Sequence, residues 1–380
     1  GYSRPTFSPA WREACDYVIA EAKRAGARWR FDAAGNVRIR HGSVPWERPV
    51  WLVGSHLDSV PSGGKYDGVI GVVVPLEIMR VCPGAPLELI VFTEEEGTTF
   101  GVGMLGSRAL SGRSDAATLA ALSNGAGQGY FDAGAGRGVD PAGIARLPEE
   151  LSGYLGMIEV HAEQGPGLWN AGKPLAVVGA ISGRRQFSIY VDGHENHAGA
   201  TAMADRTDAL AAAADVVLGV ERLGNELTAR ASHTVMTVGR LDVHPNAANV
   251  IPGRVQLTVD FRARTGSTLD SGRRMLEEEL EQVTGRRGVR CRLDLTEAVD
   301  PVALDSAVVE RLGRAAAGIG VELPEVNSGA LHDAAIMSSV LPTAMIFVAS
   351  KDGISHSPSE FSRSEDIAAA ARVVAGAIRA

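Results

Sequence analysis

Short apolar runs that end in polar or charged residues recur along this chain of 380 residues. The apolar runs predicted to form strands of the main sheet are 50–55, 87–93, 154–161 and 343–348, and strand-like stretches at 28–32 and 36–40 are predicted to form a hairpin. Continuous apolar runs of this length are typical of strands that are buried on both faces of a sheet. Helical patterns accompany these strands at 9–26, 69–81, 305–318 and from Ser364 onward. Strands that alternate with helices indicate an α/β fold with a mainly parallel sheet.

The middle of the chain has a different rhythm. The elements predicted there are strands at 185–192, 232–241, 254–264 and 289–296 and helices at 206–223 and 269–284. Their order, β-α-β-β-α-β, is that of a ferredoxin-like unit. Helix–strand alternation resumes at about residue 303, so this unit is expected to be inserted into the first one. We predict a main domain at 1–182 and 299–380 and an inserted domain at 183–298.

Charge and cysteine content exclude several classes of partner. The net charge of −8 is spread along the chain, so neither nucleic acid nor a membrane surface is expected to bind. No apolar run reaches the roughly 18 residues that a membrane helix needs, and residues 1–15 show no signal-peptide pattern. The three cysteines, Cys15, Cys82 and Cys291, form no disulfide framework and fit a reducing compartment. A cytoplasmic protein with a small-molecule partner is therefore expected.

The segment "GSHLDSVPSGGKYDG", residues 54–68, places a histidine and two aspartates directly after a predicted strand. Ligands of parallel α/β sheets bind at the carboxyl ends of strands. His56 and Asp58 share one side of an extended segment because the strand period is two. Asp58 could therefore orient a metal-bound His56. A polar turn is an equally good interpretation of this segment alone.

Three further segments put ligand-type residues after predicted strands: "FTEEEG" (92–97), "EVHAEQG" (159–165) and "GISHSPSE" (353–360). Successive carboxylates at a strand end are costly unless a cation neutralises them. A divalent metal would do so and would leave a neighbouring glutamate free as a general base. The nitrogen and oxygen donors of these segments, without cysteine, suit Zn²⁺, Mn²⁺ or Co²⁺.

The chain resembles the group of N-carbamoyl-L-amino acid hydrolases, β-ureidopropionases and allantoate amidohydrolases. This group belongs to the dinuclear metallopeptidase clan that also holds aminoacylases and carboxypeptidase G. The segments that carry the resemblance are "GSHLDSVPSGGKYDG", "EEEGTTFGVGMLGSRALSG", "HAEQGP", "NHAGATAM", "NAANVIPG", "DFRAR", "SGALHDA" and "GISHSPSE". They occur in the order of the group and cover nearly the whole chain.

The resemblance implies a site residue by residue. The implied metal ligands are His56, Asp67, Glu96, His161 and His356, with Asp67 shared between two ions. Glu95 would be the general base and Asp58 would support a ligand. His197, from the inserted domain, would stabilise the oxyanion. The implied substrate-binding residues are Gln164, Asn249, Arg262, His332 and Gly353, of which Asn249 and Arg262 would hold the substrate carboxylate together.

We therefore expect a homodimeric amidohydrolase with two divalent ions per subunit, a metal-binding catalytic domain and an inserted lid and dimerisation domain. Zn²⁺ is the expected ion, with Mn²⁺, Co²⁺ or Ni²⁺ as alternatives. The metals would activate a water molecule that attacks the ureido carbonyl of an N-carbamoyl-L-amino acid and cleaves its C–N bond. The products would be the amino acid, ammonia and CO₂. The alternatives are an allantoate amidohydrolase and an N-acyl amino acid or dipeptide hydrolase that uses the same metals.

Two other interpretations fit the residues less well. "GVGMLG", residues 101–106, matches the glycine pattern of a dinucleotide site. That pattern should follow its strand directly, whereas here three glutamates intervene beside the place of a pyrophosphate. A metal-binding protein without catalysis is disfavoured because Glu95 is present next to Glu96. Departures from the group at Thr99, Ala200, Ala202 and Leu331 bear on the substrate pocket rather than on the metal ligands.

Overall fold

The computed structural model describes residues 1–231 and 233–379. The chain divides into two compact units. Unit 1 consists of Gly1–Gly179, Ala303–Val326 and Leu331–Ala380, and unit 2 consists of Ala180–Val302 and Asn327–Ala330. The boundaries expected from the sequence, 182–183 and 298–299, lie close to the observed ones. Residues 327–330 differ from expectation, because they belong to unit 2 although they follow the return of the chain to unit 1.

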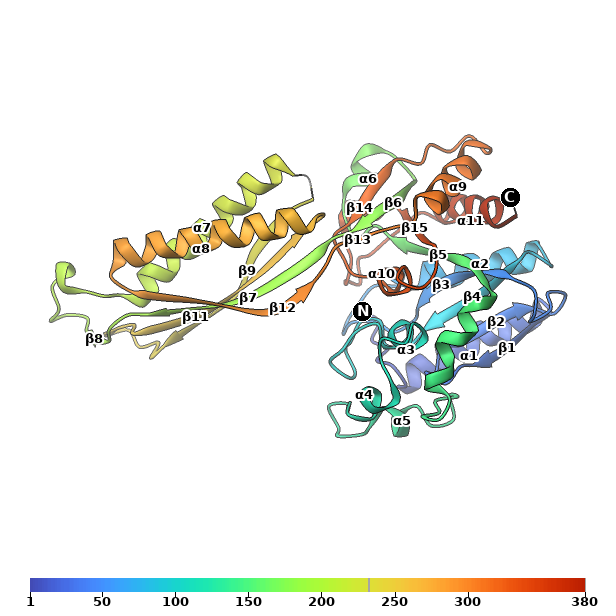
Figure 1. The fold of residues 1–380 in the computed structure, drawn as a ribbon, viewed down its shortest axis with the longest axis horizontal. Helices are drawn as coiled ribbons and strands as arrows, with labels where there is room; N and C mark the ends of the chain where they lie inside the picture. Colours follow the sequence, from blue (N-terminus) through green and yellow to red (C-terminus); the bar gives the residue numbers. More distant parts are fainter. Residues whose placement is uncertain (232, 380) are drawn as a thin grey trace. The chain divides into compact units, whose positions relative to one another are not determined.

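Unit 1 is built on one mixed sheet with the strand order β1-β2-β4-β3-β5-β15-β6-β13, and β14 pairs with β6 (Figure 1). The strands are β1 (Ala27–Phe31), β2 (Val37–His41), β3 (Val50–His56), β4 (Leu87–Phe92), β5 (Tyr154–Ala162), β6 (Leu175–Ile181), β13 (Val302–Ala303), β14 (Glu325–Ser328) and β15 (Thr343–Val348). The four central strands, β4-β3-β5-β15, are parallel. β1, β2 and β6 add antiparallel strands on either side. The parallel centre predicted from the sequence is confirmed.

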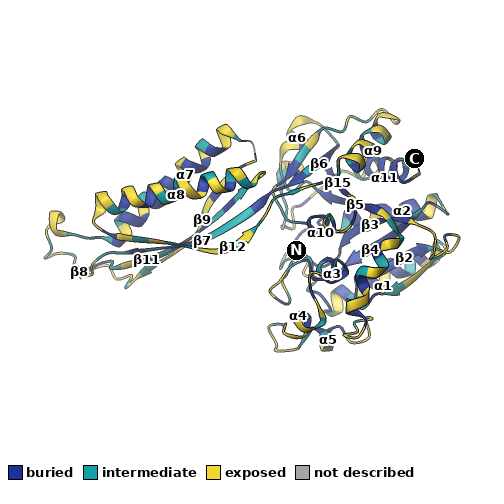
Figure 2. Cartoon of the chain, viewed as in Figure 1, coloured by how far each residue is buried: buried dark blue, intermediate teal, exposed yellow. Residues whose placement is uncertain are grey.

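Burial explains why these apolar runs form the centre of the sheet. Every residue of β3, β4 and β15 is buried, as expected for strands covered on both faces. Figure 2 shows this buried centre with exposed residues on the surrounding helices. At about 25 cal/mol per Å² of apolar surface removed from water, these runs supply the main driving force for unit 1.

The helical elements of unit 1 flank this sheet. They are α1 (Pro9–Arg24), α2 (Val69–Val81), α3 (Leu105–Leu110), α4 (Ala116–Ala120), α5 (Tyr130–Ala133), η1 (Ile144–Gly153), α6 (Gly167–Ala171), α9 (Ser306–Ala317), α10 (Asp333–Met337), η3 (Lys351–Gly353) and α11 (Ser364–Arg379). α1 begins with Ser8, which accepts a hydrogen bond from the Trp11 backbone N–H, and with a proline in its first turn. Both features are typical of helix N-termini. α2 packs on β3, β5 and α11.

Unit 2 is a four-stranded antiparallel sheet with two long helices (Figure 1). Its sheet has the order β12-β7-β11-β9, and its elements are β7 (Gly183–Asp192), β8 (Asn196–His197), η2 (Met203–Asp205), α7 (Ala209–Arg230), β9 (Val235–His244), β10 (Val250–Ile251), β11 (Arg254–Ala263), α8 (Gly266–Arg287) and β12 (Arg290–Val299). Alternate residues of β11, from Val255 to Ala263, are buried, and α7 and α8 pack against this strand. Without the short β8 and β10, the element order is β-α-β-β-α-β, as the sequence predicts.

Several elements differ from the sequence prediction. β6, β13 and β14 were not predicted, and the weakly patterned region 121–150 contains only α5 and η1. The predicted strand 232–241 corresponds to β9 at Val235–His244, and its first residue lies outside the described residues. No helix of the described residues is both long and apolar enough to span a membrane.

Candidate metal centre

Five of the predicted ligands converge at one edge of the unit 1 sheet. His56 is the last residue of β3, and Asp67 lies in the loop between β3 and α2. His161 is the penultimate residue of β5, while Glu96 follows β4 and His356 follows β15. The carboxyl ends of parallel strands meet at one edge of a sheet. β3 pairs in parallel with β4 and β5, and β5 pairs in parallel with β15. This pairing therefore brings the five side chains close together.

The two carboxylate oxygens of Asp67 face two different sets of donors. Oδ1 lies 3.1 Å from Nε2 of His161 and 3.6 Å from Nε2 of His56. Oδ2 lies 3.0 Å from Nε2 of His356, and Oε1 of Glu96 lies 3.6 Å from the same nitrogen. One carboxylate thus borders two ligand sets, which is the arrangement that a bridging ligand requires.

The ring orientation of two histidines shows what the site can accept. Nδ1 of His56 lies 2.9 Å from the Asp58 carbonyl oxygen, and Nδ1 of His161 lies 2.9 Å from the Ala162 carbonyl oxygen. A carbonyl only accepts hydrogen bonds, so both Nδ1 atoms carry hydrogen. In the neutral ring, Nε2 then presents a lone pair toward the Asp67 carboxylate. Either a proton on Nε2 or a metal ion must lie between such a pair of lone pairs, and a ring with Nδ1 already bonded to a carbonyl fits a divalent metal at Nε2.

Glu96 supports the same interpretation for the second ligand set. Its Oε1 is buried and has no hydrogen-bond partner among the described residues. A buried carboxylate oxygen without a partner is costly, and a metal ion removes that cost. Burial is the largest cause that raises the pKa of Glu96, while His56 and His356 lower it.

Among the described residues, three groups of potential ligands have their donor atoms within 4.8 Å of one another. The first is His56, Asp67 and His161, and the second is Asp67, Glu96 and His356. The third joins Glu159, His161 and His332. Glu159 already accepts hydrogen bonds from Ser55 Oγ at 2.8 Å and from the Ala334 N–H at 2.8 Å. The third group is therefore better explained as support for His161 than as another metal site.

Acidic side chains and histidines lie close together in the centre and shift the pKa values of one another. Burial alone would lower the pKa of His56, but Glu95, Asp67 and Asp58 raise it well above its ordinary value. Burial opposes ionisation of Asp67, yet the neighbouring histidines His161, His356 and His56 hold its pKa far below the ordinary value. Each proton that these histidines hold is one that a metal ion would replace.

Glu95 lies at the same edge with different neighbours. Its Oε2 is 3.7 Å from Nε2 of His56. Burial raises the pKa of Glu95 well above its ordinary value; His56 lowers it, while Asp333 and Glu96 raise it further. A buried carboxylate with a raised pKa beside a metal centre is a candidate general base.

The loops that carry these residues have locally strained or crowded backbones. Gly68 has φ +67°, and a Cβ atom there would lie 2.6 Å from the His56 ring. Only glycine fits this position between Asp67 and α2. Glu94 has φ +56° and accepts hydrogen bonds from the Thr99 and Phe100 N–H groups at 2.7 and 2.8 Å. Glu94 therefore shapes the loop that carries Glu95 and Glu96.

Other predicted site residues have different neighbours than expected. Asp58 orients His56 through its backbone carbonyl, since its carboxylate lies 3.7 Å from Nδ1 and instead accepts the Glu96 N–H at 3.0 Å. Gln164 donates from Nε2 to Asp67 Oδ2 at 3.0 Å. His332 packs edge-on against His161, with ring centroids 4.5 Å apart. Gly353 has φ +69° and packs against Pro166. These four contacts position the centre or its loops.

The remaining predicted residues lie in unit 2. His197 and Asn249 are neighbours: β8 pairs with β10 through His197 and Val250, and Ala198 N–H donates to the Asn249 carbonyl at 3.0 Å. Nδ1 of His197 accepts the N–H groups of Gly199 and Ala200 at 3.0 and 3.1 Å. Its Nε2 therefore carries the hydrogen and is exposed as a donor.

Arg262 is held by its own strand and by a neighbouring turn. Its Nε and Nη2 donate to the Asp260 carboxylate at 2.8 and 3.3 Å, and its Nη1 donates to the Gly329 carbonyl at 3.0 Å. A guanidinium has five N–H groups. Among the described residues, these contacts leave one N–H on each Nη atom for a ligand.

The length of β11 limits how Asn249 and Arg262 could together hold one substrate carboxylate. Arg262 lies eight residues along β11 from Arg254, which is about 26 Å at roughly 3.3 Å per residue. Arg254 pairs with Asp192 at the end of β7, and β8 with His197 follows beyond that end (Figure 1). β10, which Asn249 directly precedes, pairs with β8. This separation exceeds the length of a carbamoyl amino acid. One substrate cannot contact Asn249 and Arg262 of the same chain.

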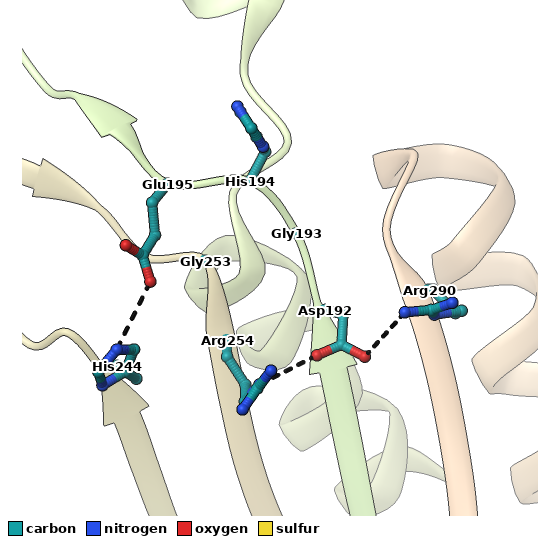
Figure 3. Close-up of a pocket in the computed structure, with 8 residues that line it drawn as sticks. All are labelled: Asp192, Gly193, His194, Glu195, His244, Gly253, Arg254 and Arg290. Atoms are coloured by element: carbon teal, nitrogen blue, oxygen red, sulfur yellow. Dashed lines mark hydrogen bonds and ion pairs between the residues drawn. The ribbon is translucent and has the colours of Figure 1, made fainter.

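A surface pocket of about 470 Å³ in unit 2 lies next to β8 (Figure 3). Its charged side chains pair with one another: Arg254 and Arg290 approach Asp192 at 3.2 and 3.6 Å, and His244 approaches Glu195 at 3.7 Å. None of the three ligand groups found among the described residues includes a residue of this pocket. The metal centre of unit 1 is therefore the better candidate for catalysis.

Sequence reasoning missed two buried carboxylates next to the centre, Glu159 and Glu360. Glu159 lies two residues before His161 on β5, so the strand period places both on one face. Glu360 ends the segment "GISHSPSE" and is 2% exposed. The signal for Glu159 was its spacing from His161. Glu360 gave no sequence signal other than its place near His356, because its partners are backbone groups distant in sequence.

Comparison with known proteins agrees with this site. Residues 52–380 match the profile of peptidase family M20/M25/M40. The chain belongs to this family. It is 36% identical to an N-carbamoyl-L-amino acid amidohydrolase of Geobacillus stearothermophilus, over 98% of this chain and 92% of that protein. It is 29% identical to an allantoate amidohydrolase of Escherichia coli K12, over 99% and 92%.

A solved structure extends the likeness to the fold. A hydantoinase/carbamoylase family amidase from Burkholderia multivorans superposes with a TM-score of 0.90 at 34% identity, over 100% of this chain and 92% of that one. The family and these relatives make the protein a hydrolase that acts on amides. The resemblance stated from the sequence motifs is confirmed.

Proposed function

We propose that the protein hydrolyses the ureido C–N bond of N-carbamoyl-L-amino acids with two divalent metal ions. The observation that carries this proposal is the Asp67 carboxylate, whose oxygens face two separate ligand sets. The similarity to an N-carbamoyl-L-amino acid amidohydrolase over 98% of the chain supports the substrate class. Hydrolysis by one water would release the amino acid and carbamic acid, which breaks down to ammonia and CO₂.

The proposed ligands divide between two ions. His56 and His161 would hold one, Glu96 and His356 the other, and Asp67 would bind both. Zn²⁺ is the ion we propose, because histidine and carboxylate donors without cysteine suit it; Mn²⁺, Co²⁺ and Ni²⁺ are alternatives. When bound, the ions would polarise the ureido carbonyl and lower the pKa of water.

Glu95 is the proposed proton carrier. Its carboxylate would take a proton from the attacking water and then deliver it to the leaving nitrogen. The exposed Nε2–H of His197 is a suitable donor for the oxyanion that develops on the ureido oxygen. Asp58 would keep His56 in the tautomer that leaves Nε2 free, by means of its backbone carbonyl.

Arg262 is the proposed partner of the substrate carboxylate. Its two remaining N–H groups, one on each Nη atom, match the two oxygens of a carboxylate. Asp260 and the Gly329 carbonyl hold the guanidinium, so little side-chain freedom would be lost on binding. Gln164, His332 and Gly353 would contribute through the ligands and loops that they contact.

We also propose a homodimer with unit 2 as its dimerisation and lid domain. Asn249 precedes β11 and Arg262 lies near its other end, so the two residues of one chain are too far apart to contact one substrate. If both act on one substrate, Asn249 and its neighbour His197 must come from the second copy. A twofold dimer would provide two such sites. We propose a cytoplasmic location, since Cys15, Cys82 and Cys291 are free thiols.

The test is a metal analysis combined with a substrate panel. The purified enzyme should contain about two divalent ions per chain and should lose activity on chelation and regain it with Zn²⁺. The panel should contain N-carbamoyl-L-amino acids, their D-enantiomers, N-acetyl amino acids, dipeptides and allantoate. The proposal predicts the highest kcat/KM for N-carbamoyl-L-amino acids. Preference for allantoate or for N-acetyl amino acids would assign the protein to one of the alternatives.

A further inference from the structure

One buried carboxylate near the metal centre has no role in the proposed reaction. Glu360 follows β15 by twelve residues and lies in the same loop as His356. Its side chain is 2% exposed. A buried carboxylate is costly unless its oxygens are hydrogen-bonded, so its partners indicate what it contributes.

The partners of Glu360 come from two loops. Oε2 accepts the backbone N–H groups of Tyr66 and Asp67 at 2.7 and 3.0 Å. Oε1 accepts the Ser355 hydroxyl at 2.9 Å. Tyr66 and Asp67 lie in the loop after β3, whereas Ser355 is the neighbour of His356 in the loop after β15. One side chain thus connects the loop of the shared ligand to the loop of a ligand from the second set.

The chain accommodates this carboxylate closely. A Cβ atom on Gly64 would lie 2.1 Å from Glu360 Oε2 and 2.7 Å from Glu360 Cβ. Gly64 therefore leaves the space through which Glu360 reaches the backbone of Tyr66 and Asp67. The Glu360 N–H also donates to the Ser357 carbonyl at 3.0 Å, which closes the turn after His356.

We propose that Glu360 is a positioning residue that sets the separation of Asp67 and His356 and thereby tunes the affinity of the Glu96–His356 metal site. His356 is 48% exposed and has φ +52°, so neither burial nor backbone preference fixes it well. The Ser355–Glu360–Asp67 contacts supply that restraint. This inference rests on the proposed two-metal function.

The contacts also predict which substitutions are tolerated. Glutamine at 360 can accept both backbone N–H groups with its amide oxygen, and its NH₂ group can donate to Ser355 Oγ. Aspartate keeps the charge but is one methylene shorter, so it cannot span both loops. If Glu360 acts through geometry, Glu360→Gln should therefore resemble the wild type, and Glu360→Asp should not.

The experiment is a calorimetric Zn²⁺ titration of the metal-free enzyme, with a competing chelator. His356→Ala identifies the binding event that belongs to the Glu96–His356 site. Glu360→Asp should weaken that event about 10- to 100-fold, the usual range for groups that orient metal ligands. Glu360→Gln should stay within about threefold of the wild type. The matched control is Glu365→Asp, a change of the exposed glutamate at the start of α11.

Ser355→Ala keeps the experiment informative if Glu360→Asp misfolds. This variant removes the Ser355 contact with Glu360 Oε1 at 2.9 Å and a longer contact with Asp67 Oδ2 at 3.4 Å, and it leaves the backbone contacts of Glu360 intact. It should also weaken the second event, whereas the control Ser359→Ala, in the same loop, should not. If Ser355→Ala and Glu360→Asp bind like their controls, or if Glu360→Gln is as weak as Glu360→Asp, the inference is wrong. A wild type that binds fewer than two ions would instead overturn the proposed function.

Discussion

Oδ1 of Asp67 lies 3.1 Å from Nε2 of His161, a nitrogen whose ring already donates from Nδ1 to the Ala162 carbonyl. The neutral ring thus directs a lone pair at a carboxylate oxygen. On the other side of the same carboxylate, Oδ2 faces His356 at 3.0 Å. Each approach needs either a proton on the histidine Nε2 or a metal ion between the partners, so Asp67 is the residue on which both proposed metal sites depend.

Asp67→Asn should therefore reduce binding at both metal sites, whereas His161→Ala and His356→Ala should each reduce binding at one. The amide keeps the size of the side chain but loses its charge and one acceptor oxygen. Elemental analysis after dialysis should give less than about one ion for Asp67→Asn and about one ion for each histidine variant. Equal metal content of all three variants would contradict a shared ligand.

The two neighbouring glutamates should separate chemistry from metal binding. Glu95→Gln should retain both ions and lower kcat about 10²- to 10⁴-fold, because a glutamine cannot carry a proton between water and the leaving nitrogen. Glu96→Gln should instead lower the metal content. Parallel metal analysis and steady-state kinetics would check this. The reverse result would exchange the roles of base and ligand.

The substrate carboxylate should be essential if Arg262 binds it. Replacing the carboxylate by an amide should lower kcat/KM at least about 100-fold, because the guanidinium would be left without its anion. Arg262→Ala should reduce this difference in kcat/KM, mainly by lowering kcat/KM for the carboxylate substrate. Arg254→Ala, at the opposite end of β11, is the control and should leave the difference unchanged. Equal kcat/KM of acid and amide for the wild type would favour another amide substrate.

The sequence predicted that the metal ligands lie close together, because both steps of that inference depend only on short sequence segments. Apolar runs fully buried on both faces indicated a parallel sheet, and His56, His161 and Glu96 lie at strand ends that such a sheet brings together. The contacts of Asp58 and Glu360 could not be predicted in this way. His56 is oriented by the carbonyl of Asp58 rather than its carboxylate, and backbone groups carry no sequence signal.

Length along a strand limits how Asn249 and Arg262 could hold one substrate. The resemblance implied that both residues hold one carboxylate, and the structure places Arg254–Ala263 in one extended strand. Its rise carries Arg262 away from the β8–β10 pair. A hairpin folded back near residue 258 would have brought the two residues together. The alternating burial from Val255 to Ala263 already favours an uninterrupted strand.

Glu88 should be important for the stability of unit 1 rather than for catalysis. It is fully buried, accepts the Arg38 Nε–H at 2.5 Å, the Arg40 Nε–H at 3.0 Å and the Tyr154 hydroxyl at 2.7 Å. Burial raises the pKa of Glu88, but Arg38 and Arg40 outweigh it and hold the pKa below its ordinary value. Glu88→Gln should cost about 3–5 kcal/mol of unfolding free energy at pH 7, because it removes the carboxylate that pairs with buried Arg40 and the nearest of the carboxylates that pair with buried Arg38.

The difference in unfolding free energy between the wild type and Glu88→Gln should decrease as the pH falls. A carboxylate with a lowered folded-state pKa stabilises the protein above its unfolded pKa of about 4.3, and this stability is lost as pH falls through the folded-state value. The gap between wild type and Glu88→Gln should therefore be constant near neutrality and shrink in acid. Urea unfolding followed by tryptophan fluorescence would measure it, since all five tryptophans lie in unit 1. Exposed Glu13→Gln is the control and should show no such gap.

The dimer proposal predicts complementation between inactive variants. Asn249→Ala and Arg262→Ala should each be poorly active as homodimers. Co-expressed with two affinity tags and purified as mixed dimers, they should recover about half of the wild-type kcat, because one of the two sites then has both residues intact. A mixed dimer of Asn249→Ala with His197→Ala should recover none, since each site would receive one damaged β8–β10 pair. Inactive mixed dimers of Asn249→Ala and Arg262→Ala, despite normal metal content, would show that the two residues do not serve one substrate from different copies.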